Sequence, residues 1–152
     1  MVFLDLFMEN VLIKVLKVSL VLLIFVVSFI GNVYLHEGGH YAAAGLLGLN
    51  PSIEISSIGE SVNYILESKP VASVSFEGDA SRGEMFLVGI MGSFMNILLS
   101  FVFLIIYFAN EKNEYVRKFA IAGLIPSILS FIVNMLPFEG TDGNILLSLL
   151  NQ

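Results

Sequence analysis

Long uninterrupted runs of apolar residues dominate the chain. A membrane-spanning helix needs about 20 apolar residues to cross about 30 Å of hydrocarbon. Three runs carry no charge and have 18, 26 and 20 residues: Val18 to Leu35, Met85 to Asn110 and Phe119 to Phe138. Allowing for flanking residues, we expect three transmembrane helices over residues 18–48, 83–110 and 116–137.

The segment before the first run, residues 1–17, has a different character. Its polar positions, which include Asp5, Glu9, Lys14 and Lys17, cover about half of a helical wheel. It is either an amphipathic helix lying in the membrane interface or the first turns of a longer helix. Acidic residues stand where a signal peptide has basic ones, so we expect the first run to be retained.

Between the first two runs, over residues 50–82, the pattern changes to short β-favouring stretches separated by turn residues. These stretches are Ile53–Ile58, Val62–Leu66 and Val71–Phe76. They predict a small antiparallel sheet at the membrane surface, with a connecting loop of some β character as the alternative. An exposed edge strand of such a sheet could pair with an extended peptide.

Small and polar residues form a stripe on each of the second and third predicted helices. The stripes comprise Gly89, Gly92, Ser93, Asn96 and Ser100, and Gly123, Ser127, Ser130 and Asn134. We expect the two stripes to face each other and to line a polar interior. Asn96 needs a partner in hydrocarbon, and either an interhelical hydrogen bond or contact with a substrate would satisfy it.

Composition supports the same class. The 152 residues are 57% hydrophobic and 13% charged, and the mean hydropathy of +0.89 is that of a multi-pass integral membrane protein. A net charge of −6 without a basic cluster argues against nucleic acid as a partner. The chain has no cysteine, so it offers no thiolate ligand. We expect one membrane-embedded domain over residues 1–152, all-α apart from the small sheet.

The only two histidines lie in the sequence His36-Glu37-Gly38-Gly39-His40. Residues four apart share one face of a helix, so both imidazoles can reach one tetrahedral metal ion. This is the H-E-x-x-H pattern, in which the glutamate acts as base on water. A packed or hydrogen-bonded histidine pair without metal is the alternative.

A further ligand must then come from a carboxylate or a weaker oxygen. Glu139 and Asp142 follow the third predicted helix, among glycines that permit tight backbone geometry. Either carboxylate could be the ligand. The alternative is an ordinary turn in which Thr141 or Asp142 caps a short helix over residues 142–152.

Three motifs together resemble the site-2 protease family of intramembrane zinc metalloproteases, over residues 18–150. They are His36-Glu37-x-x-His40, Gly92-x-x-x-Asn96, and Asn134-x-x-Pro137-x-x-x-x-Asp142-Gly143. The resemblance implies a minimal three-helix catalytic core. It also implies that His36, His40 and Asp142 hold zinc, that Glu37 is the catalytic base, and that Asn96 orients the substrate or stabilises its reacting carbonyl.

Two residues depart from the family pattern: Ser93 and Glu139 stand where the family commonly has proline. Glu139 therefore adds a carboxylate that could compete for the metal or support its ligands. We expect no appended recognition module, and therefore expect recognition and regulation to come from the helices, the strands or a membrane partner.

These observations predict an enzyme that hydrolyses peptide bonds in or near transmembrane segments of membrane proteins, after local unwinding of the substrate helix. The rival is a membrane protein that binds zinc without catalysis, as a regulatory subunit or a metal carrier. Orientation in the bilayer is left open. Five basic residues against two favour a cytoplasmic amino terminus, whereas the family resemblance implies the opposite.

Overall fold

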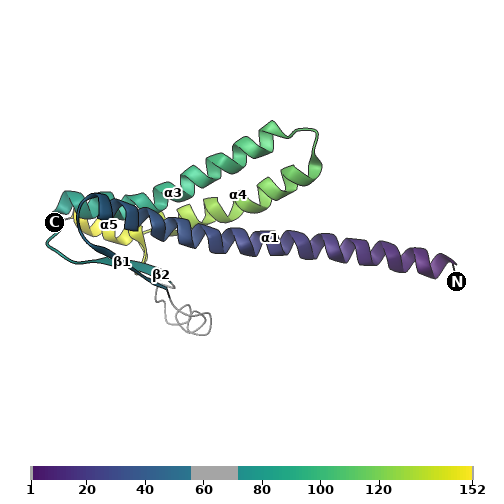
Figure 1. The fold of residues 1–152 in the computed structure, drawn as a ribbon, viewed down its shortest axis with the longest axis horizontal. Helices are drawn as coiled ribbons and strands as arrows, with labels where there is room; N and C mark the ends of the chain where they lie inside the picture. Colours follow the sequence, from purple (N-terminus) through teal and green to yellow (C-terminus); the bar gives the residue numbers. More distant parts are fainter. Residues whose placement is uncertain (1, 56–71, 152) are drawn as a thin grey trace.

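The structure, a computed structural model, describes residues 2–55 and 72–151. The elements of this part are α1 (Val2–Leu46), β1 (Pro51–Ile55), β2 (Ala72–Phe76), α3 (Arg82–Ala109), α4 (Glu114–Met135) and α5 (Asp142–Leu150). The predicted fold class is confirmed: the chain is mainly helical, with a small antiparallel sheet between the first two long helices. Figure 1 shows the other elements gathered around the C-terminal half of α1, while its N-terminal end projects away from them.

Three helices are long and apolar enough to cross a membrane: Val11–Leu46 of α1, α3 and α4. Their outward surfaces expose large apolar side chains, such as Leu20, Phe101 and Leu129. In water such a surface would be unfavourable, whereas lipid tails cover it without cost. The exposed apolar surface and the lengths of the helices both indicate a membrane protein.

Helix α1 runs without interruption from Val2 to Leu46, so the N-terminal segment forms the first turns of a long helix. Asn32, in the C-terminal half of this helix, donates a hydrogen bond from Nδ2 to the carbonyl of Ser28 at 2.8 Å. The helix ends where Gly48 adopts a φ of 75° and Leu49 N donates to the carbonyl of Ala44. This is a Schellman-type end, which turns the chain toward the strands.

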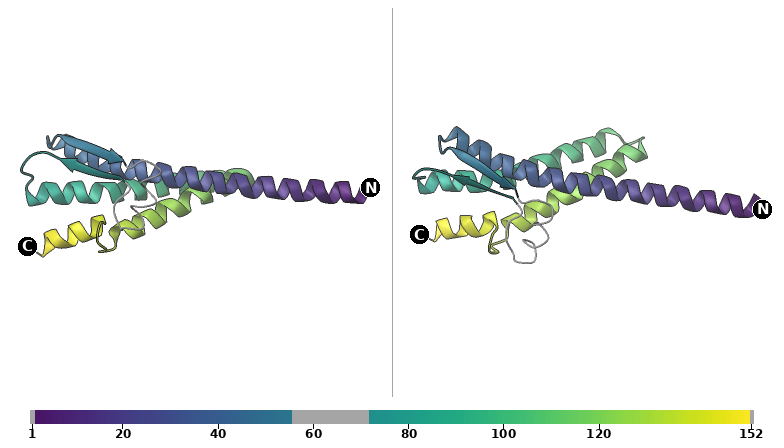
Figure 2. Two further views of the ribbon diagram at one scale, coloured as in Figure 1. Left: turned by 90° about the horizontal axis from the view of Figure 1, so that it is seen from below. Right: turned by 60° about the horizontal axis from the view of Figure 1, so that its bottom comes forward.

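Strands β1 and β2 pair antiparallel, with Pro51 opposite Phe76 and Ile55 opposite Ala72. The hydroxyls of Ser52 and Ser75 bond across the pair at 2.8 Å. Both strands run alongside α1, as Figure 2 shows. The predicted sheet is thus present. Its predicted middle stretch, Val62–Leu66, lies outside the described residues.

The polar stripe of α3 is turned inward: every member predicted for it is buried, as is Val88. On α4, Gly123 and Ser127 are likewise buried. Asn96 Nδ2 on α3 donates to Ser130 Oγ on α4 at 3.0 Å. The prediction that the two stripes face each other is therefore confirmed.

A tight turn joins α4 to α5 and places Asp142 in the first turn of the short helix. Thr141 is the N-cap residue, and its hydroxyl oxygen accepts a hydrogen bond from Asn144 N. The same hydroxyl donates to the carbonyl of Phe138 at 2.8 Å. Gly143 has no room for a side chain, because a Cβ there would overlap the carbonyl of Met135. The turn is therefore folded closely against the end of α4.

Candidate metal centre

The two histidines lie one turn apart on α1 and point to the same side. The rings meet edge to face with centroids 4.7 Å apart, and the two Nε2 atoms are 3.1 Å from each other. Both side chains are buried. The helical spacing thus brings two imidazole nitrogens to one point, as the sequence predicts.

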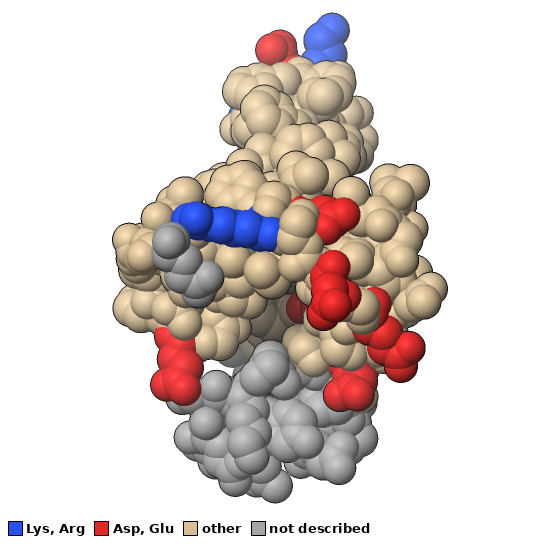
Figure 3. Space-filling model, turned by 90° about the vertical axis from the view of Figure 1, so that its left-hand side faces the viewer, with Lys and Arg blue, Asp and Glu red and all other residues tan. Residues whose placement is uncertain are grey.

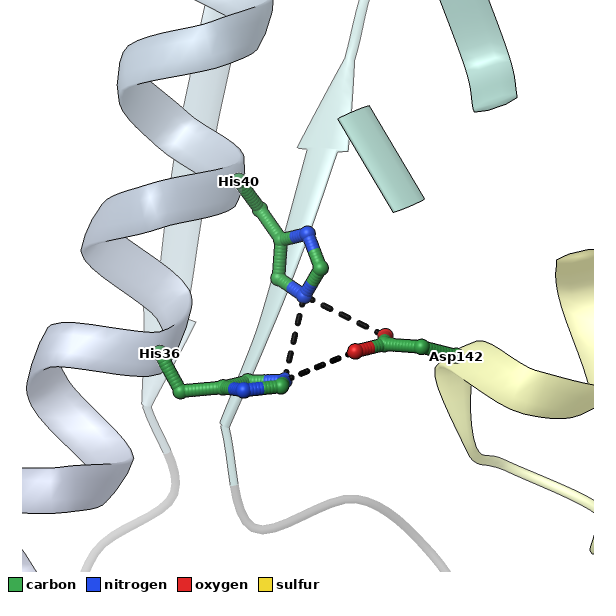
Figure 4. Close-up of side chains that lie close together, drawn as sticks. All are labelled: His36, His40 and Asp142. Carbon is green, nitrogen blue, oxygen red and sulfur yellow. Dashed lines mark hydrogen bonds and ion pairs between the residues drawn. The ribbon is translucent and has the colours of Figure 1, made fainter. Parts of the chain in front are cut away.

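Asp142 reaches that point from the start of α5 (Figure 4). Its Oδ2 lies 3.1 Å from His36 Nε2, and its Oδ1 lies 3.2 Å from His40 Nε2. All three residues are buried, and each offers a ligand atom within 4.8 Å of the others. The group could therefore hold a metal ion, and Asp142 is the carboxylate that completes it.

Helix α3 supplies a neighbour to each of the three side chains. His40 Nδ1 lies 2.6 Å from the Val88 carbonyl, Asn96 Nδ2 lies 3.0 Å from His36 Nδ1, and Ser93 Oγ donates to Asp142 Oδ2 at 3.0 Å. Groups in this position orient metal ligands, and their loss typically weakens metal binding 10- to 100-fold. Helix α3 contributes no member of the ligand group, yet its contacts orient the side chains of all three members.

The electrostatics favour an ionised carboxylate. Burial by itself raises the pKa of the Asp142 carboxyl, but hydrogen bonds and opposite charge from His36 and His40 outweigh burial and hold its pKa well below the usual range. When both imidazoles bind a metal as neutral rings, the group offers one negative charge and two nitrogen donors. This donor set suits zinc and other divalent transition ions.

The geometry also fits a metal. In a tetrahedral zinc site with bonds of about 2.0–2.1 Å, neighbouring ligand atoms are about 3.3 Å apart. The three closest separations here are 3.1, 3.1 and 3.2 Å. A small outward movement of each side chain would accommodate the ion, so the residues present fit the group that the sequence predicts.

The three side chains open onto a cavity of about 510 Å³. Glu37, the predicted base, lies on its wall and is half-buried. Among the other lining residues are Ala72, Ser73, Val74 and Phe76 of β2, and Ser130 and Asn134 of α4. The cavity thus brings the histidine pair, the glutamate, the carboxylate and one strand together.

Two other candidate site residues, Glu139 and Asn96, do not line the cavity. Glu139 is exposed and is not a member of the ligand group, so the structure places only one of the two candidate carboxylates at the histidines. Asn96 is fully buried behind His36 and does not line the cavity. Figure 3 shows this end of the molecule, where most of the acidic side chains lie on one side of a small hollow and a basic side chain crosses the face above it.

Two of these contacts are not predicted by the sequence: those of the Val88 carbonyl and of the Ser93 hydroxyl. A backbone carbonyl leaves no signal in a sequence. Ser93 did leave one, because serine replaces the proline common in the resembling family. Its contact with Asp142 depends on how the start of α5 packs against α3, which the sequence does not specify.

No protein-family model matches this chain, and no curated protein matches it at a significant level.

Proposed function

We propose that this protein is an intramembrane zinc metalloprotease of the site-2 protease type, an integral multi-pass membrane protein that cleaves transmembrane protein substrates. One observation carries the proposal. His36, His40 and Asp142 converge on one point, buried between apolar helices, with Glu37 on the wall of the adjoining cavity. A hydrolytic site within the bilayer needs such a polar cavity, because water is otherwise absent there.

In this proposal, a zinc ion held by His36, His40 and Asp142 would supply a Lewis acid that activates water near neutral pH. Glu37 accepts a proton from the attacking water while the oxygen of that water bonds to the peptide carbonyl carbon. Glu37 then returns the proton to the amine as the carbon–nitrogen bond breaks. The half-buried position of Glu37 on the cavity wall supports this role.

Strand β2 supports an extended substrate. Its residues Ala72 to Val74 line the cavity beside the histidines. Peptide bonds of a helix are shielded by their own hydrogen bonds, so an unwound stretch must be held before attack. Backbone pairing with a strand provides that hold and tolerates many side chains.

A zinc-binding membrane protein without catalysis is the competing function, and one variant separates the two. Purified protein and Glu37→Gln are reconstituted in liposomes with a panel of tagged single-span proteins carrying Gly or Pro in the span. We expect both forms to contain about one zinc. Only the wild type should cleave a member of the panel, and a chelator should abolish that cleavage.

Two outcomes oppose the proposal. Cleavage that persists in Glu37→Gln would remove Glu37 from the reaction. Zinc in both forms with no cleavage of any panel member would favour the regulatory subunit or metal carrier instead.

A further inference from the structure

Asn96 is the most enclosed polar side chain beside the metal centre. It is 0% exposed, and its Nδ2 lies 3.0 Å from both His36 Nδ1 and Ser130 Oγ. Its Oδ1, also buried, has no hydrogen-bond partner among the described residues. The two ends of an asparagine amide have the same shape, so their hydrogen bonds decide which end faces a neighbour.

The contact with His36 constrains which ring nitrogen carries the proton. With Nδ2 facing the ring, His36 Nδ1 must accept, which requires the ring proton on Nε2, 3.1 Å from both Asp142 Oδ2 and His40 Nε2. In that tautomer, the proton occupies the side of the ring that faces the other two ligand side chains. An Nε2 that binds a metal needs its lone pair, so the proton must then lie on Nδ1 and find an acceptor.

We propose that Asn96 is a positioning residue that turns its carbonyl oxygen to His36 Nδ1–H when metal binds, and thereby fixes the ring with Nε2 toward the ion. The inference rests on the metal site of the proposed function. In this inference Asn96 orients the metal ligand His36 and does not contact the substrate. This agrees with its burial away from the cavity wall.

His40 provides the contrast. Its Nδ1 lies 2.6 Å from the Val88 carbonyl, which can only accept a hydrogen bond. His40 therefore carries its proton on Nδ1 whether metal is present or not. Of the two ligands, only His36 has a neighbour that can act either as donor or as acceptor, so the adjustment falls on Asn96.

The turned amide keeps a chain of hydrogen bonds to the cavity and reverses the direction of the bond between Asn96 and Ser130. Ser130 Oγ lies 3.0 Å from the Asn96 amide and 3.4 Å from Asn134 Nδ2. With the Asn96 oxygen inward, the Ser130 hydroxyl donates to it while accepting from Asn134. Ser130 and Asn134 line the cavity, so the polar chain runs from the cavity wall to His36.

Zinc affinity tests the inference without recourse to activity. The dissociation constant for Zn²⁺ is measured by chelator competition on the full chain in detergent. Asn96→Leu, which removes the acceptor, should weaken binding about 10- to 100-fold. Asn96→Asp keeps an acceptor and should stay within about threefold of wild type. Asn32→Leu is the matched control, since Asn32 is equally buried and, among the described residues, has an unpaired Oδ1 and bonds only to Ser28.

Wild-type affinity in Asn96→Leu would overturn the inference and leave the proposed function standing. Loss in Asn96→Asp as large as in Asn96→Leu would also overturn it, because an acceptor would then not suffice. A wild-type chain that binds no zinc would remove the metal site and the inference together.

Nitrogen NMR gives a second, direct readout, because the chain has only two histidines. With ¹⁵N-labelled histidine, the spectrum of zinc-loaded protein should show the proton on Nδ1 in both rings. On zinc addition, the His36 proton should move from Nε2 to Nδ1, while the His40 proton stays. A zinc-loaded His36 with no proton on Nδ1 would overturn the inference.

Discussion

Gly92 on α3 lies directly against the imidazole of His40 on α1. A Cβ at residue 92 would overlap the ring at Nε2, the atom that faces Asp142 and His36. The glycine therefore leaves the space that the His40 ring occupies. One turn further along, Asn96 contacts His36. The four-residue spacing of Gly92 and Asn96 matches the four-residue spacing of the two histidines.

Replacing Gly92 with alanine should displace the His40 ring and weaken zinc binding at least about tenfold, because a ligand moved from its position loses affinity. Competition with a chelator measures the effect. Gly83→Ala is the matched control on the same helix, since a Cβ there meets nothing within 4 Å. Equal zinc affinity in the two variants would show that the ring has room elsewhere.

Hydropathy and helical periodicity account for most of the fold. Charge-free runs predict the three long helices because a helix needs about 20 apolar residues to cross about 30 Å of hydrocarbon. The stripe of α3 was predictable for a similar reason: small and polar residues turn away from lipid, so Gly89, Ser93 and Ser100 had to lie inside. The length of α1 was undecided because charged residues at its start suit an interfacial helix and a long one equally.

The site was predictable only in part. His36 and His40 lie four apart on one helix, so their convergence follows from local geometry. Asp142 is 102 positions beyond His40. From the residue types alone, Asp142 and Glu139 were equally good candidates for the third ligand. The family resemblance was what favoured Asp142. The contacts of α3 depend on how that helix is rotated against α1, which residue types alone do not specify.

Ser93→Ala removes the hydroxyl that donates to Asp142 Oδ2 at 3.0 Å. A hydrogen bond to a charged group contributes about 1.5–3 kcal/mol, so the carboxylate should become less well oriented and zinc binding should weaken roughly tenfold. Ser127→Ala, on α4, is the control: Ser127 is also buried, but its hydroxyl donates to the Gly123 carbonyl of its own helix. If Ser93→Ala binds zinc like the control, orientation of Asp142 does not depend on Ser93.

The two carboxylates after α4 should behave differently when truncated. Asp142→Ala removes a proposed ligand from the buried group and should abolish stoichiometric zinc, as metal analysis of the purified protein would show. Glu139→Ala removes an exposed side chain outside that group, so it should retain about one zinc per chain. Loss of zinc in Glu139→Ala alone would show that Glu139 is the ligand.

The adjacent glycines of the histidine motif differ sharply in their surroundings. A Cβ at Gly38 meets nothing within 4 Å, whereas one at Gly39 would lie 2.7 Å from the Met91 carbonyl oxygen and 2.7 Å from Met95 Cγ. The side chain of Met95 can move aside, but the backbone of α3 cannot do so without separating the two helices. Gly39 therefore marks a close backbone approach of α1 and α3 beside the metal centre.

Alanine at the two positions should then have opposite effects on stability. Gly38→Ala improves helix propensity by about 0.8–1.0 kcal/mol and should leave the thermal midpoint in detergent equal or higher. Gly39→Ala gains the same propensity but overfills the contact, at a cost of about 1–3 kcal/mol, and should lower the midpoint. The histidines beside it should also bind zinc less tightly, because α3 carries the groups that orient them. A midpoint for Gly39→Ala at or above that of Gly38→Ala would mean that the helices do not meet at this glycine.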